Sequence, residues 1–307
     1  MGVTVVQVED PGTWIPRLRR TLPDEQFLSP AEALTRITEI DVAIAEGTTA
    51  GLDGYPNLGF VQSLWAGVDS ILSTKPLPDN VALARMVSSS MTQSMVEFVA
   101  ASVLYVHRRF PTYAAQQRNR QWVEHEQPVS GDCPVAILGA GVLAGASAAG
   151  LRALGFPVQL WGRTPRAENP SVVVGEVGLA ELLATSHVIV NLLPLTADTE
   201  RIVNASFLSQ CRPGVSIINT GRGRHVDDAA LLAALDAAHV DHAVLDVFSV
   251  EPLPTDHRYW SHPRVTIMPH VAAASTADAV ALVAADGVRA YRSGMPIPNL
   301  VDRERGY

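Results

Sequence analysis

Three side chains with complementary chemistry stand in the second half of the sequence. Arg222 lies in the run NTGRG, Glu251 in DVFSVEPLP and His270 in MPHVAA. An imidazole can donate a proton near neutral pH, a nearby carboxylate orients the ring and favours its charged form, and a guanidinium stabilises negative charge on oxygen. Taken singly, each residue also has an ordinary structural explanation: a solvated loop arginine, a glutamate in a turn before proline, or a hydrogen-bonding histidine.

Each of the three follows a segment that is predicted to be a β-strand. Short β-branched segments alternate with longer Ala/Leu-rich ones, which is typical of parallel α/β sheets. The sequence from Val135 onward contains six predicted strands, the number in a complete dinucleotide-binding sheet: Val135–Leu138, Val158–Trp161, Val188–Leu192, Val215–Asn219, Val244–Val247 and Val265–Ile267. Because ligands bind at the carboxyl ends of such strands, we expect Arg222, Glu251 and His270 at one sheet edge.

The first third of the sequence predicts a second sheet. Its strands are expected at Val3–Val8, Val42–Ala45, Phe60–Leu64 and Val81–Met86. Helices are predicted at about 94–122, Val142–Leu154, Asp228–Ala238 and Thr276–Ser293. The length of 307 residues is about twice that of a usual single domain. We therefore expect two doubly wound parallel-sheet domains, residues 1–93 with 273–307 and residues 94–272.

A glycine-rich loop follows the predicted strand Val135–Leu138. The loop reads GAGVLAG and opens a helix whose first residues are Val142 and Leu143. Gly139 permits a tight turn, Gly141 lets the backbone approach a pyrophosphate, and Ala144 is small enough for the helix to pack on the strand. The N–H groups of a helix N-terminus bind phosphate. This context predicts dinucleotide binding, with a merely tight turn as the alternative.

The residues after the next strand favour NADP over NAD. An NAD site carries an acidic residue near this point for the ribose hydroxyls. Here the segment reads Trp161-Gly-Arg163-Thr164-Pro-Arg166 and contains no acid. Guanidinium groups form charge-assisted hydrogen bonds with a 2′-phosphate, which a carboxylate would repel. The alternatives are a pair of solvated arginines on a surface loop, and use of NAD.

Several long motifs together resemble the D-isomer-specific 2-hydroxyacid dehydrogenase family. They are VQSLWAGVDSIL (61–72), NLLPLTADT (191–199), INTGRG (218–223), LDVFSVEPLP (245–254), HPRVTIMPHVAA (262–273) and the ending VDRERGY. Within the family, the chain is most similar to the NADPH-preferring bacterial glyoxylate/hydroxypyruvate reductases. The resemblance implies a flavodoxin-like substrate domain, a Rossmann dinucleotide-binding domain, and hydride transfer from NADPH to small 2-oxo acids.

The resemblance also assigns roles to individual residues. His270 is the expected proton donor to the keto oxygen, Glu251 orients it, and Arg222 binds the carboxylate or carbonyl oxygen of the substrate. The carboxylate-binding loop of the family corresponds to Trp65, Ala66, Gly67 and Val68. Beyond the glycine loop, the expected cofactor contacts are Trp161, Arg163, Thr164, Arg166, Leu193, Pro194, Thr199, Thr220, Gly221 and Asp246. No metal site is expected.

Some of these positions also have simpler explanations. Leu193 and Pro194 could form an ordinary strand exit, and Asp246 could cap a turn. Trp65 at a strand end is more often core than pocket wall. As a pocket wall it would favour short acids, and Trp65→Ala would broaden substrate tolerance. The run after Arg85 lacks the acidic residue expected in this branch.

Composition and charge exclude several classes of protein. The net charge of −8 argues against a nucleic-acid partner, and no apolar run approaches the ~20 residues that span a bilayer. The N-terminus lacks a signal-peptide pattern, and Cys133 and Cys211 suit free thiols in a reducing compartment. We expect a cytoplasmic protein that acts on a small-molecule 2-oxo or 2-hydroxy acid. The family resemblance implies a homodimer built around the helix at 94–122.

Two other functions stay open. One is a dehydrogenase of the same family that acts on a different 2-hydroxy acid, and the other is a non-catalytic, nucleotide-sensing binding module. The module would retain the Arg, Glu and His set, so measured turnover is what distinguishes it from an enzyme.

Overall fold

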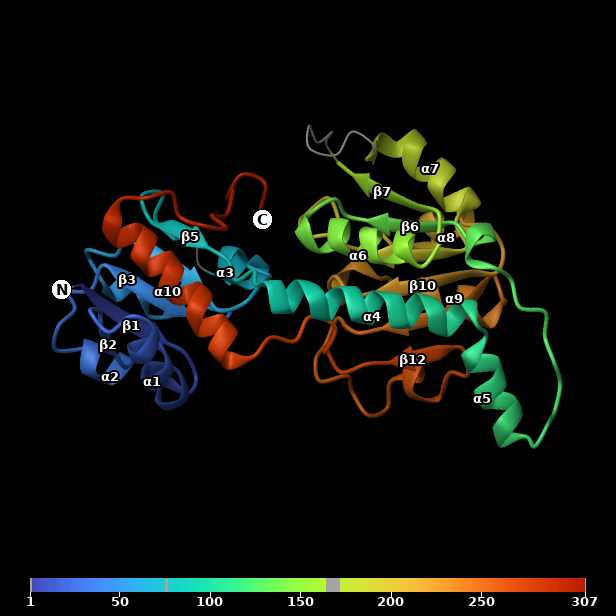
Figure 1. Ribbon diagram of the computed structural model, residues 1–307, viewed down its shortest axis with the longest axis horizontal. Coiled ribbons are helices and arrows are strands. Elements are labelled where there is room, and N and C mark those ends of the chain that lie inside the picture. Colours follow the sequence, from blue (N-terminus) through green and yellow to red (C-terminus); the bar gives the residue numbers. More distant parts are fainter. Residues whose placement is uncertain (1, 75–76, 164–171, 307) are drawn as a thin grey trace. The chain divides into compact units, whose positions relative to one another are not determined.

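The computed structural model describes residues 2–74, 77–163 and 172–306. The chain divides into two compact units: unit 1 comprises Met1–Met91 and Ser275–Tyr307, and unit 2 comprises Thr92–Ala274 (Figure 1). Each unit contains one sheet, and the pairings within both sheets are parallel. The predicted fold class, two parallel-sheet α/β domains, is confirmed.

Unit 1 has a five-stranded sheet in the order β2-β1-β3-β4-β5, which is the flavodoxin-like order. The strands are β1 (Val3–Gln7), β2 (Gln26–Leu28), β3 (Val42–Ala45), β4 (Phe60–Ser63) and β5 (Ala82–Ala84). The helices are α1 (Pro11–Thr21), α2 (Pro30–Ala33), α3 (Asp69–Thr74) and α10 (Ala277–Ser293). Helix α10 starts where Thr276 accepts a hydrogen bond from the Ala279 amide and ends at Gly294, which has φ 66°.

Unit 2 has a seven-stranded sheet in the order β12-β11-β10-β9-β6-β7-β8, which is the Rossmann order with one added strand. The strands are β6 (Val135–Leu138), β7 (Val158–Gly162), β8 (Val173–Val174), β9 (Val188–Asn191), β10 (Val215–Asn219), β11 (Val240–Leu245) and β12 (Val265–Ile267). The count of six strands predicted from the sequence is therefore wrong, because it omits β8.

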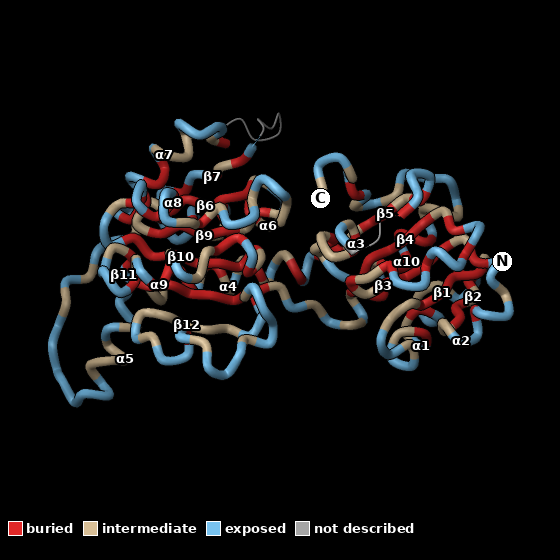
Figure 2. Tube along the Cα trace, turned by 180° about the vertical axis from the view of Figure 1, so that it is seen from behind, coloured by how far each residue is buried: buried red, intermediate tan, exposed pale blue. Residues whose placement is uncertain are grey.

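Helices cover both faces of the unit 2 sheet. Side chains of α4 (Ser89–His107) and α6 (Val142–Ala153) form one core with the sheet. Side chains of α7 (Gly175–Thr185), α8 (Ala205–Gln210) and α9 (Asp228–Asp236) form the other. Figure 2 shows the central strands buried. At their carboxyl ends, buried residues such as Thr220 and Asp246 alternate with partly exposed ones such as Arg222 and Phe248.

The single helix predicted at about 94–122 is wrong. Helix α4 ends at His107, Arg109 adopts left-handed backbone with φ 58°, and α5 (Phe110–Arg118) follows. Pro111 has no N–H to continue the helical hydrogen bonds of α4, and the left-handed residue Arg109 ends the helix. Met95, Val99 and Val103 pack in the unit 2 core, whereas no residue of α5 is buried.

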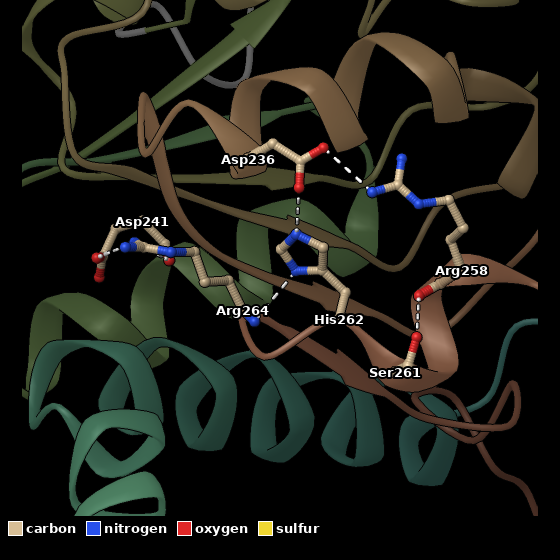
Figure 3. A network of polar contacts seen from close by, with 6 residues as sticks. All are labelled: Asp236, Asp241, Arg258, Ser261, His262 and Arg264. Atoms are coloured by element: carbon tan, nitrogen blue, oxygen red, sulfur yellow. Dashed lines mark hydrogen bonds and ion pairs between the residues drawn. The ribbon is translucent and has the colours of Figure 1, made fainter.

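A hollow of about 310 Å³ lies at the amino edge of the unit 2 sheet, lined by Leu235, Asp236, Arg258, Ser261, His262, Pro263 and Arg264. In Figure 3, Asp236 accepts from Arg258 at 3.2 Å and pairs with Nε2 of His262 at 3.3 Å. The hydrogen bond from Arg258 lowers the pKa of Asp236. Because both side chains of the Asp236–Arg258 pair are more than half exposed, that pair contributes little to stability. The network joins the end of α9 to the start of β12.

None of the helices in the described residues has the length and apolarity needed to cross a bilayer. Within the same residues, no group of three or more His, Cys, Asp or Glu side chains could hold a metal ion.

Candidate active site

His270 and Glu251 form a hydrogen-bonded pair at the carboxyl edge of the unit 2 sheet. Nδ1 of His270 lies 2.8 Å from Oε2 of Glu251. The other carboxylate oxygen accepts from the Phe248 amide at 2.8 Å, so backbone fixes the glutamate. The side chain of His270 is 55% exposed, which leaves its ring accessible to a substrate. A protonated ring that donates from Nδ1 to Glu251 has its second proton on Nε2.

The backbone at His270 is held by Asp246. The Asp246 carboxylate accepts from the amides of Val271 at 2.8 Å and Ala272 at 3.0 Å. Its carbonyl accepts from the His270 amide at 2.8 Å. Burial raises the pKa of Asp246, and the two amide hydrogen bonds oppose that rise. These contacts hold His270 in left-handed backbone with φ 56°, so Asp246 positions the imidazole.

Arg222 lies on the segment next to the one that carries Glu251. A Cβ built on Gly223 would lie 1.8 Å from the carbonyl carbon of Phe248, so the two backbones touch. The Arg222 guanidinium donates from Nη1 to the Gly221 carbonyl at 2.8 Å. Strands β10, β11 and β12 are neighbours, and the three predicted catalytic residues follow them in that order. The structure thus brings Arg222, Glu251 and His270 to one sheet edge.

The glycine loop has the geometry that a pyrophosphate needs. Gly139 has φ 123°, and a Cβ there would lie 2.8 Å from the Leu192 carbonyl oxygen. Gly141 is the N-cap of α6, and a Cβ there would meet no atom of the described residues within 4 Å. Ala144 is buried against the sheet. The loop is therefore closed on its protein side and open at the helix N-terminus, which fits the phosphates of a dinucleotide.

The segment predicted to bind a 2′-phosphate is described only up to Arg163. Its guanidinium pairs with Asp198, with Nη1 2.7 Å from Oδ2, and both side chains are substantially exposed. Thr164 and Arg166 lie outside the described residues. Trp161 donates from its indole to the Gly175 carbonyl at 3.0 Å. The strand end Val158–Arg163 contains no carboxylate.

The other predicted cofactor residues lie at the carboxyl ends of β9 and β10 and at the start of α6. Thr199 donates to the Pro194 carbonyl at 2.7 Å, and Thr220 donates to the Asn191 carbonyl at 3.2 Å. Both hydroxyls therefore hold loop structure. The remaining members are Val142 and Leu143 in the first turn of α6, buried Leu193 and buried Gly221.

The predicted substrate loop, Trp65 to Val68, follows β4 in unit 1. Trp65 is fixed through its backbone: its amide donates to the Ser63 hydroxyl at 3.0 Å, and its carbonyl accepts from the Met86 amide at 3.0 Å. Val68 is buried in the core of unit 1. Its neighbours Ala66 and Gly67 are partly exposed. The backbone of Ala66 and Gly67, between fixed Trp65 and buried Val68, is therefore accessible.

Comparison with known proteins agrees with this geometry. The NAD binding domain of the D-isomer specific 2-hydroxyacid dehydrogenases matches residues 100–272. Glyoxylate/hydroxypyruvate reductase A of Klebsiella pneumoniae is 34% identical, with 98% of each chain covered. The enzyme of the same name from Yersinia enterocolitica is 39% identical over 80% of this chain and 81% of its own. The chain belongs to the D-isomer specific 2-hydroxyacid dehydrogenase family.

Solved structures of this family have the same fold. A D-isomer specific 2-hydroxyacid dehydrogenase from Xanthobacter autotrophicus, in complex with NADPH and MES, superposes with a TM-score of 0.92 at 34% identity. It covers 100% of this chain and 99% of its own. The NADPH-dependent glyoxylate/hydroxypyruvate reductase of Sinorhizobium meliloti, in complex with NADP and sulfate, has a TM-score of 0.92 at 32% identity. That similarity covers 100% of both chains.

His225 is a site residue that the sequence reasoning missed. It is fully buried. Its Nδ1 accepts from the backbone N–H of Arg222 at 3.1 Å and lies 2.8 Å from the side-chain nitrogen Nδ2 of Asn191. Its Nε2 lies 3.2 Å from the Pro194 carbonyl. Asn191 also donates to Asn219 at 2.9 Å. The imidazole therefore ties the Arg222 turn to the loop after β9.

Proposed function

We propose that this dehydrogenase reduces small 2-oxo acids, such as glyoxylate and hydroxypyruvate, to 2-hydroxy acids with NADPH. The observation that carries the proposal is the His270–Glu251 hydrogen bond at the carboxyl edge of a dinucleotide-binding sheet. Arg222 lies on the adjoining segment of the same edge. The NADPH-dependent reductase of Sinorhizobium meliloti and the reductases from Klebsiella and Yersinia support this choice of substrate and cofactor.

The residues have separate tasks in this reaction. NADPH, when bound, supplies the hydride that reaches the carbonyl carbon. His270 donates the proton on Nε2 to the carbonyl oxygen, and Glu251 keeps the ring oriented and favours its charged form. Arg222 binds the substrate oxygen on which negative charge develops, where a guanidinium is most useful. The glycine loop and the first turn of α6 hold the phosphates.

We further propose that unit 1 binds the substrate and unit 2 binds the dinucleotide. In unit 1, the partly exposed backbone of Ala66 and Gly67 lies at the carboxyl edge of the sheet, after β4. Backbone N–H groups at such an edge bind carboxylates. In unit 2, the glycine loop supports the assignment to dinucleotide.

The test of the proposal is turnover. Oxidation of NADPH, followed by its absorbance, should be rapid with glyoxylate and hydroxypyruvate and slower with pyruvate. Turnover confined to another 2-oxo acid would identify a different dehydrogenase of the same family. NADPH binding without turnover of any 2-oxo acid would identify a nucleotide-sensing module and would refute the reductase.

Arg163 is expected to set the preference for NADPH. Arg163→Ala should raise KM for NADPH by roughly tenfold or more, because a charge-assisted hydrogen bond to phosphate contributes about 1.5–3 kcal/mol. KM for NADH should change little. Asp198→Asn is the matched variant: it removes the carboxylate that pairs with Arg163, so KM for NADPH should fall or stay unchanged. Equal rises in KM for both cofactors in Arg163→Ala would contradict this role.

We also propose that the enzyme is a cytoplasmic homodimer. Apolar side chains are exposed on α5 and on the segment after it: Phe110 at 54%, Trp122 at 93%, Val123 at 51% and Val129 at 64%. The segment is ordered by its own contacts, since the His125 amide donates to the Tyr113 hydroxyl at 3.2 Å. An apolar surface of this kind marks a protein interface. The two free, buried cysteines suit a reducing compartment.

The homodimer predicts a specific loss of association. Trp122→Ser should shift the sedimenting species from twice the chain mass of 32.8 kDa toward the monomer. The reason is that removing an exposed aromatic anchor from an interface costs about 2 kcal/mol or more of binding free energy. Trp260→Ser is the control, because Trp260 is an exposed tryptophan too, at 54%, but stands between β11 and β12, away from α5 in the sequence. A wild-type chain that sediments as a monomer would refute the dimer.

A further inference from the structure

The indole of Trp65 lies on a glycine and not in the core. Trp65 is 50% exposed and belongs to none of the buried apolar clusters of the described residues. The explanation of this tryptophan as a core residue is therefore wrong. The first residue of the predicted substrate loop is therefore a large apolar side chain that stays exposed, which is typical of a binding surface.

The benzo ring of Trp65 occupies the space where any side chain at position 47 would stand. A Cβ built on Gly47 would lie 2.0 Å from Cζ3, 2.5 Å from Cη2 and 2.6 Å from Cε3 of the indole. Gly47 has φ 63°, follows β3 by two residues and is buried. The ring thus reaches from the end of β4 to the end of β3, and only glycine leaves room for it there.

Both ends of this contact are held rigidly. The Ser63 hydroxyl accepts from the Trp65 amide at 3.0 Å and donates to the Trp65 carbonyl at 3.1 Å. On the other side, the Glu46 amide donates to the Gln7 carbonyl at 3.4 Å, and the Glu46 carboxylate accepts from the Glu9 amide at 3.3 Å. The backbone that carries Gly47 is therefore tied to β1, and the backbone that carries Trp65 is tied to its own strand end.

The location of the ring gives the contact a function. In a sheet of order 2-1-3-4-5, ligands bind at the carboxyl ends near the β1/β3 switch point. The indole covers the end of β3 there, and the proposed carboxylate-binding backbone, Ala66 to Val68, follows Trp65 directly. A substrate held by its carboxylate at that backbone would present the rest of its carbon chain to the indole.

From these contacts we infer that Gly47 and Trp65 together set the substrate size limit, with Gly47 as a specificity-determining residue that holds the indole wall in place. The inference rests on the proposed reduction of 2-oxo acids. It extends that proposal to the substrate class. Acids that carry only hydrogen or a small group on the keto carbon are accepted, and acids that carry a branched or aromatic group there are excluded.

The test compares two glycines of one loop. Gly47→Ala places a methyl group inside the space of the indole, whereas Gly51→Ala meets only Gln7 at 3.7 Å. Gly51 has φ 82°, so both variants carry similar backbone strain. The measured quantity is the ratio of kcat/KM for phenylpyruvate to kcat/KM for glyoxylate. It should change about tenfold or more in Gly47→Ala and stay at the wild-type value in Gly51→Ala.

A double-mutant cycle shows whether the effect passes through the indole. Trp65→Ala alone should raise the same ratio about tenfold or more, and adding Gly47→Ala to it should change the ratio no further. A change of equal size with and without the indole would overturn the inference, as would identical ratios in Gly47→Ala and Gly51→Ala. If Gly47→Ala does not fold, an unchanged kcat/KM ratio in Trp65→Ala is enough by itself to overturn the inference.

A second readout does not depend on turnover. Acrylamide quenching of tryptophan fluorescence, with Trp65→Phe subtracted as the blank, should report greater exposure of Trp65 in Gly47→Ala than in Gly51→Ala. A wild-type enzyme that reduces no 2-oxo acid would refute the proposed function, while the quenching comparison would still test the Gly47–Trp65 contact. Equal quenching in the two glycine variants would refute that contact.

Discussion

Replacing His270 by asparagine should lower kcat for glyoxylate reduction by about 10²- to 10⁴-fold, the usual contribution of a positioned general acid. Asparagine is close in size and keeps a group that can hydrogen-bond to Glu251. However, an amide does not release a proton to the keto oxygen. Affinity for NADPH, measured by fluorescence titration, should be unchanged because His270 holds no part of the phosphate loop. A kcat within about fivefold of wild type would remove His270 as the donor.

His262→Asn is the matched control for this variant. His262 stands eight residues earlier in the same sequence motif, and its ring also pairs with a carboxylate, that of Asp236. It lies just before β12, at the amino edge of the sheet, whereas His270 follows the carboxyl end of that strand. The control should keep wild-type kcat, which would show that the loss in His270→Asn comes from position and not from removal of any histidine.

Glu251→Gln removes the charge of the carboxylate and one of its two acceptor oxygens. Oε1 of Glu251 accepts from the Phe248 amide and Oε2 faces Nδ1 of His270, whereas a glutamine has a single oxygen for these two donors. The charge-assisted hydrogen bond to the ring is lost, so kcat for glyoxylate should fall by about tenfold or more. A kcat equal to that of the wild type would show that the carboxylate serves only to hold the loop.

The sequence predicted the sheets better than it predicted the helix that crosses from unit 1 to unit 2. Long β-branched runs such as Val215–Asn219 have a pattern that only a buried parallel strand explains. The three-residue β2 and the two-residue β8 are too short to show any pattern. The end of α4 is signalled in the sequence by Pro111 alone, because nothing in the side chain of Arg109 indicates its left-handed backbone. These differences have local causes.

At the candidate site, the sequence identified the side chains that we propose as catalytic and missed those that hold them. Arg222, Glu251 and His270 were recognisable because each follows a strand and lies in a family motif. The His225 ring contacts the Arg222 turn and the segment from Asn191 to Pro194, and such contacts exist only in the folded chain. A signal was present in Asn191 and Asn219, since each is an amide that ends a mostly apolar, buried strand.

Arg292 is expected to be the largest single electrostatic contributor to the stability of unit 1. This residue of α10 pairs with Glu25, with Nη2 2.5 Å from Oε1, and also with Asp41. Glu25 is only 6% exposed and accepts a further hydrogen bond from Thr4 at 2.6 Å. Burial alone would lower the pKa of Arg292, but its hydrogen bonds to Glu25 and Asp41 raise that pKa above its usual value. The cluster therefore ties α10 to the amino ends of β1, β2 and β3.

Arg292→Leu should lower the free energy of unfolding by about 3–5 kcal/mol, because it leaves the Glu25 carboxylate buried without its cation. The measurement is urea unfolding followed by circular dichroism. Arg289→Leu is the control on the same helix: its partner Asp286 is half exposed, so the cost should be below about 1 kcal/mol. Replacing Glu25 by leucine in the Arg292→Leu background should restore part of the loss, since the uncompensated charge is then gone. If Arg292→Leu cost no more than Arg289→Leu, the cluster would not be what holds α10 to the sheet, and burial of Val280, Ala284 and Val288 would have to suffice.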